Sequence, residues 1–178
     1  MTINDLHISY DGVCIYATTV VKARTIGKLL LFLSNLSLAT IIAFFLIEQI
    51  IAAAIVFLLG EIFMIRYTLW NLYGEERLII NTKSISFQYH YGFFTTVLQT
   101  ISFNKRISIC RLDDMTEGDQ TYVKCLFQSY NENYLSENIY ASVLHINKAD
   151  YEKLIRKFDQ LYVDDLTHAY EFPLIHLN

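Results

Sequence analysis

The sequence predicts an α+β membrane protein, in which a transmembrane hairpin of two helices is joined to a small antiparallel β domain closed by a C-terminal amphipathic helix. Three observations lead to this fold class: a long apolar run over residues 26–70, alternating β-type runs on both sides of it, and a helically spaced run near the C-terminus. A bilayer core of roughly 30 Å needs about 20 mostly apolar residues per helical span. The apolar run is therefore long enough for two spans.

A single polar pair, Glu48-Gln49, interrupts the apolar run. No ionisable residue occurs over residues 29–47, and Glu61 alone occurs over residues 50–65. The alternative is a buried helical hairpin of a soluble protein, but a chain of 178 residues has little polypeptide left to cover such a hairpin on all sides. We therefore expect two antiparallel spans joined at this pair, over residues 27–47 and 50–67.

Basic residues near the ends of the apolar run predict its orientation. Lys22, Arg24 and Lys28 precede the first span and Arg66 ends the second, whereas the connecting tip carries Glu48. Because Lys and Arg remain on the cytoplasmic side, both chain ends are expected in the cytoplasm. The run is also too long for the core of a signal peptide, so we expect a retained anchor. Three aromatic residues are expected at the inner headgroup level: Tyr67, Trp70 and Tyr73.

Glu61 is the candidate functional residue of the hairpin. Folding back at Glu48-Gln49 places it opposite Asn35 and Ser37. A carboxylate inside a membrane is a candidate functional site. The alternative is a structural contact, in which Glu61 forms a hydrogen bond with Asn35, with Ser37 or with a partner helix. The sequence leaves both interpretations open.

Small residues in the two spans predict close packing. The same fold-back places Ala43 opposite Ala54, and Gly60 lies in the second span. Small side chains allow two helix backbones to approach each other closely. We therefore expect these three residues at helix–helix contacts.

The residues on either side of the hairpin alternate between apolar and polar types, which is typical of half-buried strands. In the N-terminal arm (residues 1–25), two such runs flank Asp11-Gly12, a pair that favours a type I′ turn. This small hairpin is expected to pair with the later sheet. Residues 71–178 form the predicted β domain, with an acidic loop at Asp113–Asp119. Its predicted strands are Leu78–Asn81, Ile85–Tyr91, Thr95–Phe103, Arg106–Leu112, Tyr122–Tyr130 and Ile139–Ile146.

A run with helical spacing follows the last predicted strand. Apolar residues between Lys148 and Tyr162 fall on one face of a helix, which is expected to lie on the apolar face of the sheet. Asn147 is the predicted N-cap, with Asp150 three residues further on. In the tail, residues 172–177 are expected to add a short strand or to dock on a partner.

The sequence contains no recognisable catalytic motif, and we expect neither enzymatic activity nor a cofactor or metal. The histidines are scattered, and the acidic residues of the predicted loop lack the spacing of a calcium site. Cys14, Cys110 and Cys125 are widely spaced, which favours reduced thiols. The chain has a net charge of −4, and the residues after Trp70 account for all of it, which is a poor match for nucleic acid. Lys105 and Arg106 are the candidate contacts with lipid headgroups.

A short motif follows the apolar run: Trp70-x3-Gly74-Glu75-Glu76-x-Leu78-x-Ile80. With the preceding hairpin and the following strands, this motif resembles uncharacterised bacterial two-helix membrane proteins that carry a pleckstrin-homology-like (PH-like) domain on the cytoplasmic side. The turn at Asn81–Lys83 departs from phosphoinositide-binding PH domains, because it has one basic residue rather than a cluster. The resemblance implies a PH-like fold, a bacterial inner membrane location and a binding or scaffolding role.

Two functions follow from these observations. The first is a non-enzymatic, membrane-anchored adaptor or accessory subunit that contacts membrane lipids and binds other membrane proteins, or further copies of itself, through its hairpin and PH-like domain. The second is a sensor of lipids or small ligands at the cytoplasmic face, which uses Lys105 and Arg106 and the space between sheet and helix.

Overall fold

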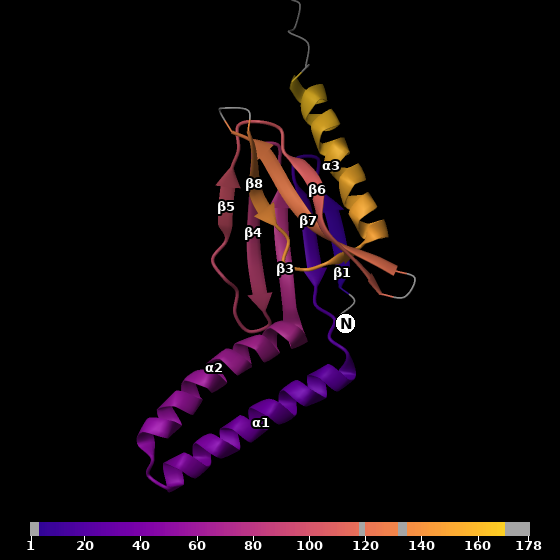
Figure 1. Cartoon of the computed structure of the whole chain (residues 1–178). Helices are drawn as coiled ribbons and strands as arrows, with labels where there is room; N and C mark the ends of the chain where they lie inside the picture. The colour runs from indigo at the N-terminus through magenta and orange to yellow at the C-terminus, as the bar shows by residue number, and fades with distance from the viewer. Residues whose placement is uncertain (1–3, 118–119, 132–134, 170–178) are drawn as a thin grey trace, which may run out of the picture. The chain divides into compact units, whose positions relative to one another are not determined.

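The computed structural model describes residues 4–117, 120–131 and 135–169, without the side chains of residues 113, 117 and 164–169. The chain divides into two compact units. The first contains residues 1–5, 20–75 and 89–96, and the second contains residues 6–19, 76–88 and 97–178. The elements, shown in Figure 1, are β1 (Asp5–Tyr10), β2 (Ile15–Val20), α1 (Thr25–Ile47), α2 (Ile51–Tyr73), β3 (Gly74–Ile80), β4 (Ser84–Tyr91), β5 (Gln99–Ser102), β6 (Ser108–Glu117), β7 (Gln120–Tyr130), β8 (Ser136–Ala141), β9 (Ile146–Asn147) and α3 (Lys148–Ala169).

The first unit contains the predicted helical hairpin. Helices α1 and α2 each have 23 residues and pack side by side, joined by a short turn in which Gln49 has a φ of 58° (Figure 1). At 1.5 Å per residue, each helix is about 34 Å long. Both helices are long and apolar enough to cross a membrane. The expected two-helix apolar hairpin is therefore present.

The two helices contact each other along a narrow seam. Residues on this seam recur at spacings of three and four, as in left-handed helix pairs. The seam residues are Leu31, Asn35, Leu38, Ile42 and Phe45 of α1, and Ala54, Phe57, Glu61, Met64 and Thr68 of α2. Outside the seam, most large apolar side chains of both helices are exposed.

The second unit contains a hydrophobic core between two antiparallel sheets and α3. The first sheet has the strand order β1-β2-β3-β4-β5, and in the second sheet β7 pairs with β6, β8 and β9. The N-terminal arm pairs with the later sheet through β2 and β3, as expected. The fully buried core side chains include Ile15, Ile80, Ile85, Ile107, Val123, Phe127, Leu154 and Leu161.

A buried carboxylate interrupts the strand that was predicted over Ile139–Ile146. Glu76 of β3 is 1% exposed and accepts hydrogen bonds from the backbone N–H groups of Val143 (2.8 Å) and Leu144 (2.9 Å), and from the hydroxyl of Tyr140. Because these N–H groups donate to Glu76, they are not available for hydrogen bonds with a neighbouring strand. The predicted strand is consequently two strands, β8 and β9, separated by the segment that binds Glu76.

Helix α3 packs against β7 and β9, and two of its tyrosine hydroxyls reach the edge strand β6 and the residue before it. The backbone N–H of Ile107 donates to the Tyr162 hydroxyl at 3.3 Å, and the Tyr151 hydroxyl donates to the carbonyl of Ile109 at 3.2 Å. An exposed edge strand can pair with a strand of another chain, and a helix packed over the edge blocks such pairing. The predicted helix thus packs on the sheet, and it does so partly at the sheet's edge.

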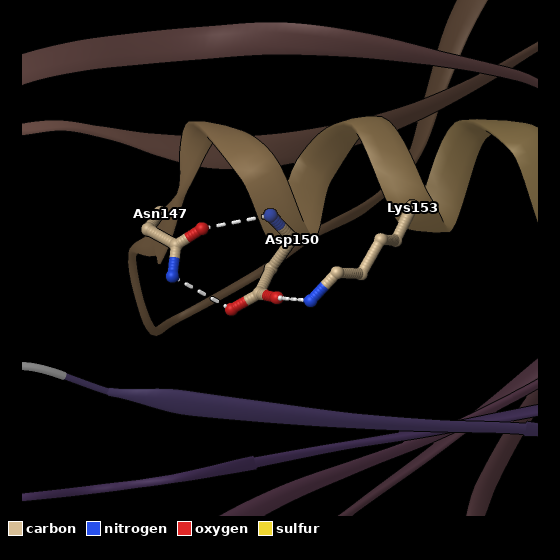
Figure 2. A network of polar contacts seen from close by, with 3 residues as sticks. All are labelled: Asn147, Asp150 and Lys153. Carbon is tan, nitrogen blue, oxygen red and sulfur yellow. Dashed lines mark hydrogen bonds and ion pairs between the residues drawn. The ribbon is translucent and has the colours of Figure 1, made fainter.

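The N-terminus of α3 has the predicted cap (Figure 2). The Asn147 side-chain oxygen accepts from the backbone N–H of Asp150 at 2.7 Å, and its amide group donates to the Asp150 carboxylate at 2.8 Å. Lys153 bonds the other oxygen of Asp150 at 2.8 Å. The cap therefore satisfies one helix N–H donor and holds an acidic group in the first turn, where the helix dipole favours it.

Two predicted turns differ from the observed ones. Residues 113–117 extend β6 instead of forming an acidic loop, and Asp113 to Glu117 pair with Lys124 to Gln120 of β7. This part of the strand was not predicted because its residues are mostly polar and do not alternate between apolar and polar types. At the β1–β2 turn, Gly12 has a positive φ but Asp11 does not, so the turn is not type I′. Instead, the Asp11 carboxylate accepts from the N–H groups of Val13 and Cys14.

Replacement of the cap residue tests the local origin of α3. We expect Asn147→Ala to destabilise the protein by about 1 kcal/mol, because a helix N–H loses its acceptor. In a chain of this size that corresponds to a fall in Tm of roughly 2–4 °C. The measurement is thermal unfolding of the full chain in detergent micelles, followed by circular dichroism. Asn147→Ser is the control: it keeps a capping oxygen and should retain most of the stability.

A second prediction concerns Glu76. Burial raises the pKa of this carboxyl above its ordinary 4.5, although the hydrogen bonds from Tyr140, Val143 and Leu144 oppose the shift. A raised pKa in the folded state contributes stability that is complete below pH 4.5 and is lost as the pH rises through the folded-state pKa. Glu76→Gln places an NH₂ group among hydrogen-bond donors, which costs about 1–3 kcal/mol per unsatisfied group. We expect this cost to shrink as the pH rises.

The measurement is Tm against pH for the full chain in detergent, with Glu137→Gln as the control at an exposed acidic position. A cost that grows with pH would mean that the hydrogen bonds outweigh burial and that folding lowers the pKa of Glu76.

Candidate functional site

The predicted polar contact inside the hairpin has different partners from those expected. The Asn35 amide donates to the Thr68 hydroxyl at 2.8 Å and to the carbonyl of Leu31 at 2.6 Å. Glu61 is 8% exposed, and its Oε2 atom has no hydrogen-bond partner among the described residues. Ser37 lies on the exposed side of α1. The expected bond from Glu61 to Asn35 or Ser37 therefore does not form within the hairpin.

The register of the two helices explains this difference. Asn35 contacts Thr68, and the rings of Phe45 and Phe57 lie 5.3 Å apart, so each contact involves an α2 residue further along the chain than the predicted fold-back gives. Side chains of an α-helix tilt toward its N-terminus. In an antiparallel pair, two side chains that touch therefore belong to residues with higher numbers than the two residues whose Cα atoms lie at that level. In this register Glu61 lies level with the apolar Ile42.

The small residues are divided between the seam and the outer surface. Ala54 is buried, whereas Ala43 and Gly60 are exposed. A Cβ atom added at Gly60 would have no neighbour within 4 Å. Ala43, which was expected to contact the buried Ala54, is exposed, and the space beside Gly60 is open.

Lys105 and Arg106 line a crevice of about 620 Å³ in the second unit, between β6 and α3. Ile107 and Ile109 contribute one wall, and Ile155 and Phe158 contribute the other. The lining is completed by Ser108, Tyr130 and Asp159. The crevice is thus apolar inside with charged groups at its margin, which is the usual composition of a small-molecule or side-chain binding site.

The two basic side chains of the crevice are held in place. The Arg106 guanidinium lies 3.7 Å from the Asp159 carboxylate and 4.6 Å from the centre of the Tyr162 ring. The Lys105 ammonium donates to the carbonyl of Asn131 at 2.9 Å. These contacts orient both cations beside the apolar interior, where they suit an amphipathic anion or an acidic side chain.

An aromatic cluster in the first unit was not identified as a group from the sequence. The Trp70 ring lies 5.1 Å from that of Tyr91 and 5.9 Å from that of Tyr89. Two further pairs extend the cluster: Tyr73 with Phe93 at 6.1 Å, and Tyr91 stacked on Phe94 at 4.7 Å. The run Tyr89 to Phe94 is rich in aromatic residues, and this signal could have pointed to half of the cluster. The contact with α2 was not evident because it joins distant parts of the chain.

The remaining chemistry-bearing groups are dispersed. In the part of the chain that the structure describes, no three His, Cys, Asp or Glu side chains gather in a way that could hold a metal ion. Cys14, Cys110 and Cys125 are free thiols. Burial, with a smaller effect of Glu76, raises the pKa of Cys125 to about 12, so this thiol is unreactive. The side chain of His168 and the predicted strand at residues 172–177, with His176, lie outside the described residues.

Comparisons with protein-family models, with curated proteins and with solved structures found no match for this chain. The resemblance to membrane proteins with a PH-like domain therefore stays a prediction.

We expect substitutions of the two polar residues of the hairpin, Glu61 and Asn35, to have opposite effects on the stability of the α1–α2 contact. Glu61→Leu removes a buried polar atom that lacks a partner, so we expect it to strengthen the α1–α2 contact, since such an atom costs about 1–3 kcal/mol. Asn35→Leu removes the unpartnered Oδ1 atom but also both bonds donated by the amide group, to Thr68 and to the Leu31 carbonyl. Because two bonds are lost and Thr68 loses its donor, we expect this change to weaken the contact. Hydrogen–deuterium exchange of both helices in detergent measures the effect: slower for Glu61→Leu and faster for Asn35→Leu. Faster exchange in Glu61→Leu would indicate that the carboxyl has a stabilising partner outside the described chain.

Proposed function

We propose that this protein is a non-enzymatic adaptor or accessory subunit anchored in the bacterial inner membrane, with both termini in the cytoplasm. The observation that carries the proposal is the pair of 23-residue apolar helices, whose large side chains outside the seam are not covered by the described chain. Lipid tails and other membrane helices are the environments that accept such a surface without cost.

The strand pairing supports the proposed topology. β2 precedes α1, β3 follows α2, and the two strands are neighbours in one sheet. The N–H of Val21 donates to the carbonyl of Gly74 at 2.8 Å, which joins the two ends of the hairpin. This pairing supports a topology in which both flanks lie on the same side of the bilayer. Lys22, Arg24 and Lys28 mark that side as cytoplasmic.

The arrangement of the crevice supports a binding role rather than catalysis. Its hydroxyl nucleophile candidate, Ser108, contacts the carbonyl of Gln128 at 3.4 Å and the thiol of Cys110 at 4.0 Å. Neither group is a general base of the kind that activates a serine. The apolar walls with Arg106 and Lys105 at the margin suit an apolar side chain and an acidic group of a partner protein. In this proposal the two sheets and α3 form a PH-like domain that binds protein.

A lipid or small-ligand sensor is the second candidate function. It is favoured by the same crevice, because an apolar interior of about 620 Å³ next to two cations also suits an acyl chain with an anionic head. The two candidates differ in what occupies the crevice.

Photocrosslinking in cells distinguishes the two occupants. A photoreactive amino acid replaces Ser108 in the crevice of the full-length protein, and the matched control carries it at Val13, an exposed residue of the β1–β2 turn. An adaptor is expected to give a discrete adduct of protein size at position 108 and none at position 13. A sensor is expected to give a mass increase of lipid or small-molecule size. Arg106→Gln should reduce either adduct several-fold.

Equal adduct patterns at positions 108 and 13, or no effect of Arg106→Gln, would contradict specific use of the crevice. The anchor is tested separately in the same cells: both termini should be protected from protease added outside, and alkaline extraction should leave the protein in the membrane fraction. Release into the soluble fraction would overturn the proposed function.

A further inference from the structure

We propose that the turn bearing Phe93 and Phe94 is a second membrane contact, whose rings enter the lipid interface beside the C-terminal end of α2. The inference rests on the proposed function, because it requires α2 to cross a bilayer. It adds a lipid-binding surface outside the two spans.

The turn has a defined structure that displays its aromatic rings. The Tyr91 N–H donates to the carbonyl of Phe94 at 2.8 Å, and the Thr96 N–H donates to the carbonyl of Tyr89 at 2.8 Å. Gly92 has a φ of 83°, a conformation that favours glycine. Within this closed turn, Phe93 is 84% exposed and Phe94 is 42% exposed. An exposed phenylalanine side chain gains free energy when it moves from water into a lipid interface, and Phe93 has most of its surface available for this transfer.

The turn is continuous with the end of α2 in the same unit. The Phe93 ring lies 6.1 Å from the Tyr73 ring, and a Cβ atom at Gly92 would lie only 2.9 Å from the Cβ of Tyr73. Since α2 is about 34 Å long and the hydrocarbon core is about 30 Å thick, a span that starts at the tip reaches the opposite interface near Tyr73. Phe93 therefore lies at the depth where aromatic side chains are enriched.

Arg66 supports this depth. Its guanidinium lies 5.3 Å from the centre of the Tyr91 ring and donates to the Tyr91 hydroxyl at 3.4 Å. A long basic side chain near the end of a span extends toward the interface, where it meets lipid phosphates. The cation and the aromatic rings thus form the combination that anchors membrane proteins at the headgroup level. The surface consists of Arg66, Trp70, Tyr73, Tyr91, Phe93 and Phe94.

The single tryptophan of the chain, Trp70, allows a direct test. In a Trp70→Phe background, Phe93→Trp places the only fluorophore in the turn of the full-length protein. The protein is reconstituted into vesicles of phosphatidylcholine and phosphatidylglycerol that contain lipids with a spin label at a shallow or a deep acyl carbon. Two matched proteins carry the tryptophan at Phe63, on the exposed face of α2, and at Val13, in the β1–β2 turn.

We expect the shallow label to quench Phe93→Trp several-fold more than Val13→Trp, and the deep label to quench Phe63→Trp most strongly. Quenching of Phe93→Trp no greater than that of Val13→Trp, with Phe63→Trp quenched by the deep label, would overturn this inference and leave the anchor intact. Absence of quenching at Phe63→Trp would overturn the proposed function as well. If Trp70→Phe disturbs the fold, the same comparison is made with Trp70 present and its quenching in the parent protein subtracted.

Discussion

The buried carboxylate of Glu76 is the interaction on which the arrangement of the second unit depends. It belongs to the first sheet through β3, and its three donors belong to the chain that follows β7 of the second sheet: Tyr140, Val143 and Leu144. A carboxylate in this position is tolerated because both oxygens are hydrogen-bonded. The same bonds end β8, turn the chain and start β9, whose last residue caps α3. One polar group therefore links β3 of the first sheet to β8 and to the segment between β8 and β9 of the second.

The buried carboxyl group of the hairpin, that of Glu61, has a different environment from that of Glu76. Glu61 lies in the seam, and its Oε2 atom has no partner among the described residues, whereas the amide group of Asn35, about two turns away, donates to Thr68. The Asn35–Thr68 pair fixes the helix register, because a shift of either helix would break it. Glu61 adds no such bond within the described chain. Glu61 therefore stays a candidate functional residue of α2.

The sequence predicted the elements whose causes are local. The apolar run gave the hairpin, and the Asn147–Asp150 pair gave the cap, because each depends on neighbouring residues. Two features depend on contacts between distant residues and were missed or misplaced: the helix register and the break at Glu76. The acidic extension of β6 pairs with residues close by in the chain, and it was missed because its faces lack an apolar alternation. The crevice is an intermediate case. Lys105 and Arg106 were identified as the basic cluster, but the apolar walls from α3 emerged from the packing.

The geometry of the junction between α2 and β3 explains the spacing of Trp70 and Gly74 in the motif that follows the apolar run. Gly74 caps α2 by donating its N–H to the carbonyl of Trp70, and its own carbonyl accepts from Val21 beside β2. A Cβ atom at this position would lie 2.2 Å from the Trp70 carbonyl oxygen and 2.9 Å from its ring. Glycine is therefore required by close approach rather than by a left-handed backbone. No loop separates α2 from β3, so this glycine combines the C-cap of the helix with the first residue of the strand.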